Sequence, residues 1–540
     1  ELAPIINFRD FHSVNKQEII QLKQNVNGNK VKIIVDEKSS YPIYMNLSEG
    51  KYNEQENNIF KNMFYIEEEK RGFDAEENHV IPGIYEIEIK PNVEKEISLI
   101  ISLEENIEEL NVKNIIDNEI IRLNTIFNNS LLIDNRKIKK DKKELEKDEE
   151  IKNYLIATDN FIVYRPTFGY HTIIAGYPWF LDWGRDSLIS FEGLLLIPKR
   201  FQEAKEVLLT LVRDIKKGLV PNGYSGFDNR PLYNSVDASL LLFEQIQKYI
   251  QYTGDYEFVK ENLYEKMKNI IKSYIEGIDV DNNNIYLDKD NLIVSGRSDT
   301  QNTWMDVKIG NIAVTPRNGK TVEINALWYN ALMIMSELLN KYKDKKNAKV
   351  CKQLAENCKQ EFNQKFYNKK RKSLYDVLDD EKIRPNQLFS MSLTYQIIDT
   401  RSEIAKNIIK TVETQLLNEY GLQTLSAKDE GFIAVYEGGE KQRDSSYHQG
   451  ITWPWLLGLY YNALKNIKKE TKIKNEEKKI EEKILAFIER TEKTFKKELY
   501  ENGCIGNIAE IYDSKKPQLP KGTIAQAWSI SEIFRIILGK

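Results

Sequence analysis

The pattern of apolar positions changes once along the chain, from a two-residue period to a helical one. Residues 31–35 and 96–103 are short apolar runs, and residues 83–89 alternate apolar and polar side chains as a half-buried strand does. A Pro-Asn pair at 91–92 separates the last two runs as a turn would. These runs predict an antiparallel, β-sandwich-like sheet over roughly the first 105 residues.

From about residue 150 onward, apolar residues recur with helical spacing, most clearly at 204–212 and 324–339. The pattern predicts about twelve helices, with ends uncertain by a few residues. They are expected to start near Glu150, Ser187, Phe201, Ser235, Tyr256, Thr321, Ala348, Asn386, Arg401, Gly450, Glu476 and Thr523.

The connections between these helices alternate in length. Short ones fall near Pro198, Gly254, Lys345 and Thr400, with a somewhat longer charged one near Thr471. The long ones span 165–186, 218–234, 280–320, 367–386, 418–449 and 500–522. Helices joined by tight turns run antiparallel, so every second connection emerges at the same end of the bundle. The long loops should therefore share one face of a closed ring of helical hairpins, an (α/α)6 barrel.

The predicted fold class is mainly α, with the barrel preceded by the antiparallel β-sandwich-like domain. We place a β-rich domain at 1–125, a charged helical linker at 126–153 and the barrel at 154–540. The run Arg136–Lys152 is nearly all Lys, Glu and Asp, and could be a partner-binding segment or a solvated helical connector. Its mixed signs favour the connector.

Composition narrows the class of protein. The 540 residues are 41% hydrophobic, enough for a large core, and the formal net charge of −4 argues against a nucleic-acid-binding chain. Three scattered cysteines offer no disulfide framework and fit a cytoplasmic protein. No apolar run is long enough for a membrane span. The first residues, 1–4, contain neither a start methionine nor a signal-peptide core, which indicates a trimmed chain.

The long loops concentrate tryptophan with polar residues. All seven tryptophans fall between 179 and 528. Trp328 and Trp528 lie inside helical patterns and are expected in the core. The others lie in or beside the long loops: Trp179, Trp183, Trp304, Trp453 and Trp455. Aromatic rings pack on the C–H faces of sugars, and carboxylates, amides and guanidinium groups bind their hydroxyls. This composition therefore suits a concave sugar site.

Glycoside hydrolysis requires two carboxyl groups, one on each side of the scissile bond. Asp306 is flanked by Trp304 and Met305, an apolar setting that would raise its pKa and suit a general acid. Glu510 lies in an apolar stretch of the last long loop, where composition alone leaves an ordinary salt-bridging glutamate equally open. His448 is equally open, as a residue lining the site or as a structural histidine.

Other chemistries find little support. The chain has four histidines without an HxxxH spacing, so no metal site is expected. It contains neither a P-loop nor a GxSxG elbow. No cofactor is therefore expected.

Five motifs in the long loops resemble, in order, those of the glycogen debranching enzyme C-terminal family, the bacterial and archaeal amylo-α-1,6-glucosidases. They are the segments 183–186 (WGRD), 233–238 (YNSVDA), 303–306 (TWMD), 384–387 (RPNQ) and 506–513 (GNIAEIYD). The segment 7–12 (NFRDFH) resembles the end of the family's N-terminal β domain, of which members carry more. Nothing resembles the glucanotransferase barrel of the eukaryotic enzyme.

The resemblance implies an (α/α)6 barrel that releases α-1,6-linked glucose from branched, glycogen-like glucan with inversion. It makes Asp306 the general acid and Glu510 the general base. Arg185 and Asp186 would hold glucose hydroxyls, with Trp183, Asp237 and Lys308 lining the same subsite. Further substrate-binding residues are expected in the long loops: Trp304, Asn386, Gln387, His448, Trp453 and Trp455. For inversion, the two carboxyl groups should stand about 6.5–9.5 Å apart.

Two alternatives remain at this stage. One is another (α/α)6 hydrolase, glucoamylase-like or trehalase-like. The other is a glucan-binding protein on a barrel that has lost catalysis, against which the presence of both Asp306 and Glu510 argues.

Overall fold

The computed structural model describes residues 1–10, 13–35, 41–107, 111–133, 140–225 and 229–540. Phe11 and His12 of the 7–12 motif, and residues 136–139 of the charged run, lie outside the described residues. The chain forms two compact units. The first comprises Glu1–Thr125 with Glu437–Glu440, and the second comprises Ile126–Tyr436 with Lys441–Lys540. None of the helices in the described ranges combines the length and apolar character that crossing a membrane requires.

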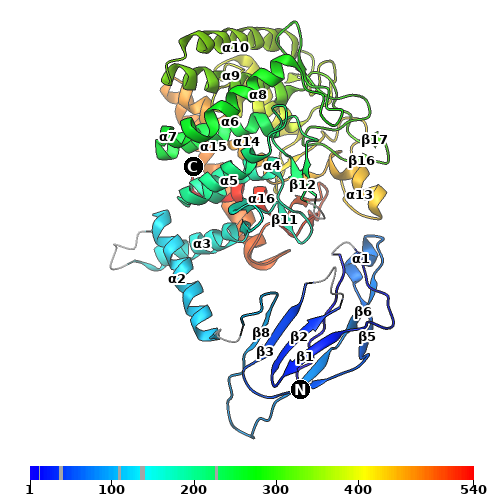
Figure 1. Ribbon diagram of the computed structural model, residues 1–540. Helices are drawn as coiled ribbons and strands as arrows, with labels where there is room; N and C mark the ends of the chain where they lie inside the picture. Colours follow the sequence, from blue (N-terminus) through cyan, green and yellow to red (C-terminus); the bar gives the residue numbers. More distant parts are fainter. Residues whose placement is uncertain (11–12, 36–40, 108–110, 134–139, 226–228) are drawn as a thin grey trace. The chain divides into compact units, whose positions relative to one another are not determined.

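The first unit is made mainly of antiparallel strands, drawn in blue in Figure 1. Its elements are β1 (Lys23–Asn27), β2 (Lys30–Ile34), β3 (Ile43–Leu47), β4 (Lys51–Glu54), β5 (Ile59–Phe64), α1 (Ile66–Lys70), β6 (Glu76–Val80), β7 (Gly83–Glu86) and β8 (Leu99–Ser102). One sheet has the order β1-β2-β3-β8, while β4 pairs with β7 and β5 with β6. The predicted strands at 31–35, 83–89 and 96–103 correspond to β2, β7 and β8.

Alternating side chains of these strands form the core of the first unit. Val31 and Ile33 of β2 and Met45 of β3 point to one side of the four-stranded sheet, as the two-residue period requires. Tyr52 of β4 and Tyr85 of β7 pack in the same cluster, with ring centroids 4.8 Å apart. Two layers therefore bury one core, and this part of the fold agrees with the predicted sandwich-like arrangement.

The second unit is a barrel of helices in two concentric rings. The inner ring consists of α4 (Gly184–Phe191), α6 (Ala238–Thr253), α9 (Val322–Lys341), α11 (Phe389–Ser392), α14 (Leu456–Glu470) and α16 (Ala527–Ile537). Each of these contacts the next, and α16 contacts α4, which closes the ring. The outer helices are α3 (Lys142–Asp159), α5 (Phe201–Arg213), α8 (Tyr264–Glu276), α10 (Lys345–Lys365), α12 (Glu403–Gln415) and α15 (Lys474–Glu501). The predicted (α/α)6 barrel is confirmed.

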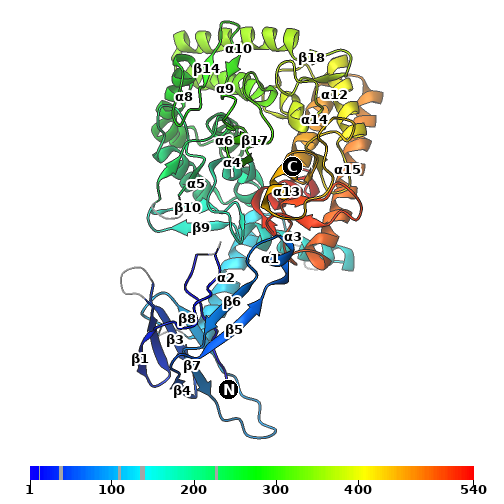
Figure 2. The ribbon, with the colours of Figure 1, turned by 90° about the vertical axis from the view of Figure 1, so that its right-hand side faces the viewer.

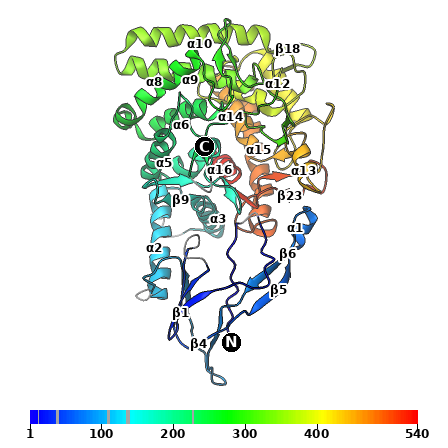
Figure 3. The same cartoon turned by 45° about the vertical axis from the view of Figure 1, so that its right-hand side comes forward.

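The two rings appear directly in the views of the barrel. In Figure 2, α5, α8, α10, α12 and α15 run around the edge with α4, α6, α9 and α14 inside them. Figure 3 shows α16 in red among the inner helices. The remaining helical elements are α2 (Val112–Ser130), η1 (Glu192–Leu196), α7 (Tyr256–Phe258), η2 (Val259–Leu263), η3 (Pro385–Leu388) and α13 (Glu440–Tyr447).

Burial patterns explain which helices are inner and which are outer. Outer helix α5 buries one stripe, Ala204, Val207, Leu208 and Leu211, at the spacing of a single helix face. Inner helix α16 is buried from Ala527 to Ile537, because it packs on neighbours all around. A helix that is apolar on one stripe can cover a core, but only a helix apolar on most sides can stand inside the ring.

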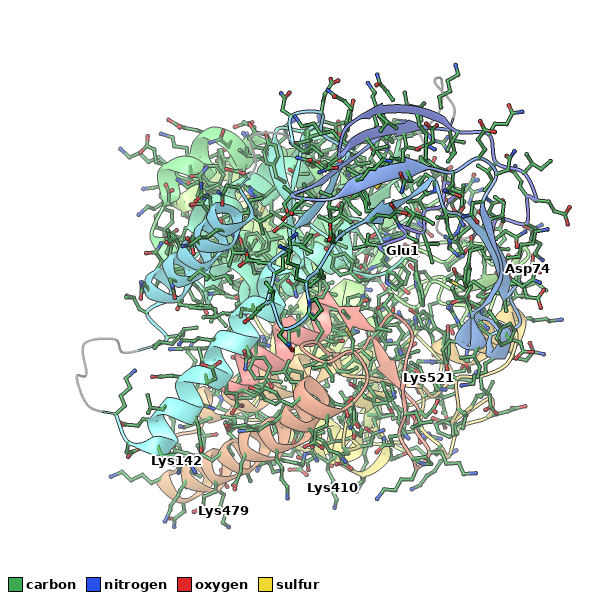
Figure 4. All side chains as sticks on the ribbon, turned by 90° about the horizontal axis from the view of Figure 1, so that it is seen from below. Glu1, Asp74, Lys142, Lys410, Lys479 and Lys521 are labelled. Carbon is green, nitrogen blue, oxygen red and sulfur yellow. The ribbon has the colours of Figure 1, made fainter. Side chains whose placement is uncertain are left out.

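The charged run before the barrel is partly a barrel helix. Helix α3 begins at Lys142, earlier than the predicted start near Glu150, because Asp141 and Glu144 form a capping box. Lys147 pairs with Glu492 of α15 at 2.6 Å, and further along Lys496 of α15 pairs with Glu150 at 3.1 Å. Figure 4 labels Lys142 on α3 and Lys479 on α15, with the two helices side by side. The later part of the run thus packs on the barrel wall.

The long connections gather on one side of the barrel helices, on the right in Figure 1. They contain short antiparallel strands: β9 (Ile162–Arg165), β10 (Tyr170–Ile173), β11 (Gly176–Tyr177), β12 (Gly223–Tyr224), β13 (Pro231–Leu232), β14 (Tyr286–Leu287), β15 (Ile293–Val294), β16 (Lys308–Ile309), β17 (Ile312–Ala313), β18 (Tyr367–Asn368), β19 (Ser373–Leu374), β20 (Leu422–Gln423), β21 (Thr452–Trp453), β22 (Ile511–Tyr512), β23 (Pro520–Lys521) and β24 (Ala525–Gln526). The sheet β20-β21-β22-β23 joins the fifth and sixth loops, and β11 pairs with β24 to join the first loop to the last.

Candidate active site

A cavity of about 170 Å³ lies on the loop side of the barrel unit. Its walls come from the long loops and from the loop-side ends of α4 and α16. The lining residues are Phe180, Trp183, Arg185, Asp186, Trp304, Asp306, Tyr447, His448, Trp453, Glu510 and Trp528. Three carboxyl groups, one guanidinium group and several aromatic rings therefore share one small space.

Helix α4 brings Arg185 and Asp186 to the cavity. The helix starts at Gly184, directly after extended Trp183, so both charged residues occupy its first turn. A Cβ at position 184 would collide with the carbonyl oxygen of Pro221, so the position requires glycine. This close approach lets the loop before α6 lie beside the start of α4, where the two meet as Gly184 N donates to Asn222 O at 2.8 Å.

Arg185 connects two aspartates through separate nitrogens. Its Nε donates to Asp237 Oδ2 and its Nη1 to Asp306 Oδ2, each at 2.8 Å. Asp237 is in turn held by Ser235, whose Oγ donates to Asp237 Oδ1 at 2.5 Å. The Asp306 side chain is 28% exposed, whereas that of Arg185 is 4% exposed. Of the two aspartates that Arg185 binds, Asp306 is the one that lines the cavity, and a buried guanidinium group thus orients it.

Two opposing effects act on the pKa of Asp306. Burial in the cavity raises it, and the guanidinium group of Arg185 lowers it. Burial is the larger effect, so the pKa of Asp306 lies above its ordinary value. The apolar flanking residues predicted this direction, but the ion pair that opposes it was not visible in the sequence.

Glu510 is almost fully buried and is held by neutral donors. Tyr447 Oη donates to Glu510 Oε1, and the backbone amide of Thr523 donates to Oε2 at 3.2 Å. Gly522 adopts a positive φ of 70°, and a Cβ at this position would collide with the Glu510 carboxylate. Burial raises the pKa of Glu510 to about 7, although the Tyr447 hydroxyl and the Thr523 amide act in the opposite direction. The group therefore titrates near neutral pH.

Asp186 is the third carboxyl group of the cavity. Burial raises its pKa well above the ordinary value, and the nearby charges of Glu510 and Asp306 act in the same direction. Gln526 Nε2 donates to Asp186 Oδ1 at 3.3 Å, which ties the start of α4 to the last loop. A carboxyl group in this setting can bind a neutral hydroxyl as donor or as acceptor.

Aromatic rings wall the cavity. Trp304 meets Trp453 and Trp455 edge-on at centroid distances of 5.4 and 5.1 Å. Trp453 also packs against Trp528 at 5.7 Å, and Trp455 stacks on Trp528 at 5.4 Å. His448 stacks on Trp453 at 5.3 Å. This cluster offers flat apolar surfaces beside the charged groups, as a sugar ring requires.

A buried ionic network supports the loop that carries Asp306. Arg317 binds Asp376 and Glu323, in the first case with Nε to Oδ2 at 2.7 Å. Arg317 Nη1 also donates to Thr303 Oγ1 at 3.1 Å. Asp376 Oδ1 accepts from Asn386 Nδ2 at 2.8 Å, and Asn386 Oδ1 accepts from Trp304 Nε1 at 2.7 Å. We call Arg317, Glu323, Asp376 and Asn386 the buried network.

The structure brings most of the predicted site residues together. The predicted residues that line the cavity are Trp183, Arg185, Asp186, Trp304, Asp306, His448, Trp453 and Glu510. Three others stand one layer behind: Asp237 holds Arg185, Asn386 holds the Trp304 indole, and Trp455 packs on Trp304.

Three residues that the sequence suggested for the site lie outside the lining. Gln387 donates to Arg384 O at 3.0 Å and accepts from Leu374 N at 3.2 Å, so its amide fastens the fourth loop. Lys308 begins β16, which pairs with β17 in a hairpin, and it is not among the lining residues. Trp179 is partly buried and also lies outside the lining. Lys308 is expected at the cavity from the family resemblance, and Gln387 and Trp179 from the composition of the long loops.

Sequence reasoning missed three lining residues. Phe180 was passed over in favour of the adjacent Trp179. Tyr447 stands directly before His448, and its hydroxyl contact with Glu510 has no local signal. Trp528 was expected in the core, and it is indeed 5% exposed, but the same ring also lines the cavity. Trp328 is fully buried as predicted and stacks on Tyr274.

Within the described residues, no group of three or more His, Cys, Asp or Glu side chains is arranged to hold a metal ion. The cavity itself offers carboxyl, phenol, imidazole and guanidinium groups. Two carboxyl groups with different surroundings, in one small aromatic cavity, are suited to acid–base catalysis.

Comparison with known proteins identifies the family to which the chain is similar. Residues 156–535 match the family model of amylo-alpha-1,6-glucosidase, and residues 1–96 match that of the glycogen debranching enzyme N terminal. A glycogen debranching enzyme of Saccharomyces cerevisiae is 25% identical over 370 residues, which cover 52% of this chain. The match spans 24% of that relative's length.

A solved structure shares the fold. The crystal structure of a bacterial glucoamylase complexed with acarbose superposes with a TM-score of 0.58 at 13% identity, covering 95% of this chain and 73% of the other. At this identity the likeness concerns the fold alone, and it agrees with the (α/α)6 barrel. The family match covers most of the chain, and the chain belongs to the amylo-alpha-1,6-glucosidase family of glycoside hydrolases.

Proposed function

We propose that this chain releases α-1,6-linked glucose from the branch points of a glycogen-like α-glucan, with inversion at the anomeric carbon. The observation that carries the proposal is that Asp306 and Glu510 line the same small, aromatic-walled cavity. The description of the family and the name of the yeast relative support the linkage and the branched substrate.

The proposed reaction is a single displacement. Asp306 gives its proton to the glycosidic oxygen as the bond from that oxygen to the anomeric carbon breaks. Glu510 takes a proton from a water molecule whose oxygen bonds to the opposite face of the same carbon. The products are β-glucose and a glucan with a free 6-hydroxyl, and proton exchange with solvent restores both carboxyl groups.

The surroundings of Glu510 support its part as the base. A general base works best when its pKa lies near the working pH, and burial brings the pKa of Glu510 to about 7. The hydrogen bond from Tyr447 fixes one carboxylate oxygen, which leaves the group oriented rather than freely rotating. Thr523 fixes the other oxygen from the backbone.

The size of the cavity supports the release of one sugar at a time. Its volume of about 170 Å³ is below the roughly 300–1,000 Å³ of pockets that enclose drug-sized ligands. One terminal glucose unit fits this scale better than a stretch of oligosaccharide. We infer that Arg185 and Asp186 bind its hydroxyls and that Trp304 and Trp453 pack on its apolar faces.

The proposal is tested with a branched limit dextrin whose α-1,6 branches have been trimmed to single glucose residues. Released glucose is followed by proton NMR in the first minutes, before the anomers equilibrate. We expect β-glucose as the first product, and none from the Asp306→Asn variant. Early α-glucose would overturn inversion.

A parallel panel separates the competing activities. Panose and isomaltose carry α-1,6 bonds, maltose carries an α-1,4 bond, and trehalose joins two anomeric carbons. Preference for maltose would point to a glucoamylase-like enzyme, and preference for trehalose to a trehalase-like one. Binding to glycogen without release of glucose from any of them would overturn the catalytic proposal.

A further inference from the structure

His448 is enclosed by aromatic rings on several sides and also lines the cavity. It is 1% exposed, stacks on Trp453 with an interplanar angle of 18°, and meets Trp304 edge-on at 5.3 Å. The Tyr447 ring lies 4.8 Å away. The same residue is one of those that line the cavity.

Both ring nitrogens of His448 are buried, and neither has a hydrogen-bond partner among the described residues. Buried polar atoms in folded proteins are normally paired, so two unpaired atoms on one side chain need an explanation. By contrast, the backbone of the same residue is fixed, since its carbonyl oxygen accepts from Arg384 Nη1 at 2.7 Å. The ring is therefore held in place with its hydrogen-bonding capacity unused.

The imidazole is neutral in this setting. Burial lowers the pKa of His448 well below its ordinary value, and the guanidinium groups of Arg384 and Arg185 lower it further. A neutral imidazole has one N–H donor and one nitrogen acceptor. A sugar hydroxyl also both donates and accepts, so the two groups are complementary.

We propose that His448 sets the sugar specificity of the cavity, by a hydrogen bond to one hydroxyl of the terminal glucose residue. This assignment rests on the proposed function, and it deepens it: the ligand is a hexopyranoside that carries that hydroxyl. A sugar lacking it would leave a buried imidazole nitrogen unpaired when the cavity closes over the ring. Such a mismatch is a strong basis for rejecting an analogue.

The test combines changes in the enzyme with changes in the substrate, as a double-mutant cycle does. Initial rates are measured for α-D-glucosyl fluoride and its 2-, 3-, 4- and 6-deoxy analogues, with the wild-type protein and with His448→Phe. We expect His448→Phe to lower kcat/KM for the parent fluoride by roughly 10- to 100-fold, the scale of one buried unpaired group. For one deoxy analogue the two proteins should be nearly equal.

The cycle cancels differences in intrinsic reactivity between the fluorides, because each analogue is compared across the two proteins. Phenylalanine keeps a flat ring against Trp453, so packing changes little while hydrogen bonding is lost. His448→Gln is the second variant, and its side chain keeps a donor and an acceptor. It should change the ratio of kcat/KM for the parent fluoride to kcat/KM for that same analogue, while the preference for the parent remains. Thermal unfolding of each variant reports on folding.

The outcomes separate this proposal from the one on which it rests. If His448→Phe lowers the rates for all five fluorides by one common factor, His448 is structural and the proposal is overturned. If His448→Phe does not fold, the same decision falls to His448→Gln, and unchanged ratios for all four analogues overturn the proposal. If the wild-type protein releases no glucose from limit dextrin, the proposed function fails first, whatever the fluorides show.

Discussion

Within one cavity, Asp306 is paired with a guanidinium group, whereas Glu510 accepts hydrogen bonds from a phenol and a backbone amide. The support behind the two groups differs as well. The loop of Asp306 rests on the buried network, in which Arg317 binds two carboxylates. The loop of Glu510 rests on the strand pairing of β22 with β21 and β23. Ion pairs support the loop of Asp306, which we call the Asp306 side. Backbone hydrogen bonds support the loop of Glu510, which we call the Glu510 side.

This difference matters because the two carboxyl groups share one cavity. A cation next to Asp306 favours its ionised form, while Glu510, with neutral donors only, has its pKa raised to about 7. Burial therefore raises both pKa values, but only that of Asp306 is opposed by a neighbouring cation. The proposed roles require a proton on Asp306 and an ionised Glu510 during the reaction.

The largest effects are expected from removing either carboxyl group. Asp306→Asn and Glu510→Gln should each lower kcat on limit dextrin by about 10²- to 10⁴-fold, the usual contribution of general acid–base catalysis. On α-D-glucosyl fluoride, whose leaving group needs little protonation, Asp306→Asn should recover most of its loss and Glu510→Gln should not. The comparison is of initial rates on the two substrates. Recovery by Glu510→Gln instead would exchange the two roles.

The second effect concerns the stability of the Asp306 side. Asp376 faces both Arg317 and Arg384, so Asp376→Ala leaves two buried guanidinium groups with Glu323 alone, and breaking a buried pair in this way costs about 3–5 kcal/mol. Urea unfolding followed by tryptophan fluorescence would measure the change. The matched variant on the other side, Tyr447→Phe, removes one hydrogen bond and should cost far less. Equal losses of unfolding free energy in the two variants would show that ion pairs do not support Asp306 more strongly than this hydrogen bond supports Glu510.

The third effect is a gain of stability in Glu510→Gln. The pKa of Glu510 rises from 4.5 to about 7 on folding, so the folded chain holds a proton that the unfolded chain has released between these values. The contribution of this carboxyl group to stability is therefore fully present below pH 4.5 and is lost as the pH rises to 7. Glutamine stays neutral, so the variant should gain about 3 kcal/mol at pH 8 and almost nothing at pH 4.

Thermal unfolding at several pH values measures this gain. Asp306→Asn serves as the comparison, because Arg185 already offsets part of the burial of that charge. Its gain at pH 8 should be smaller than that of Glu510→Gln. A gain for Glu510→Gln that does not change with pH would show that the carboxyl is not titrating in this window.

The smallest effect is a shift in the pH profile of Tyr447→Phe. The Tyr447 hydroxyl lowers the pKa of Glu510, so its removal should raise that pKa by about one unit, the scale of one hydrogen bond to a charged group. The acidic limb of kcat/KM should move to higher pH by the same amount. Tyr512→Phe is the control, because its hydroxyl binds Glu498 at 3.1 Å. Its profile should match that of the wild type.

The fold was predictable because its signals are local. Apolar stripes such as that of α5 and the alternation of short and long connections are read within tens of residues, and they fix an (α/α)6 ring. The pairing of Arg185 with Asp306, 121 residues apart, has no such signal. The contact of Arg317 with Asp376 likewise follows from no periodic pattern in the sequence. Motif resemblance named the two carboxyl groups, but their surroundings came from the structure.

The pairing of β11 with β24 has a consequence for when the site exists. Gly176 and Tyr177 pair with Gln526 and Ala525, and Ala527 N donates to Ala175 O at 2.9 Å, so the first loop of the barrel is completed by the last. A ribosome makes the chain from its amino end, and contacts across about 350 residues form late. Nascent chains shorter than about residue 528 would carry Asp306 and most of the wall without Glu510 properly seated. The cavity is therefore incomplete until the segment around residue 526 has paired with the segment around residue 176.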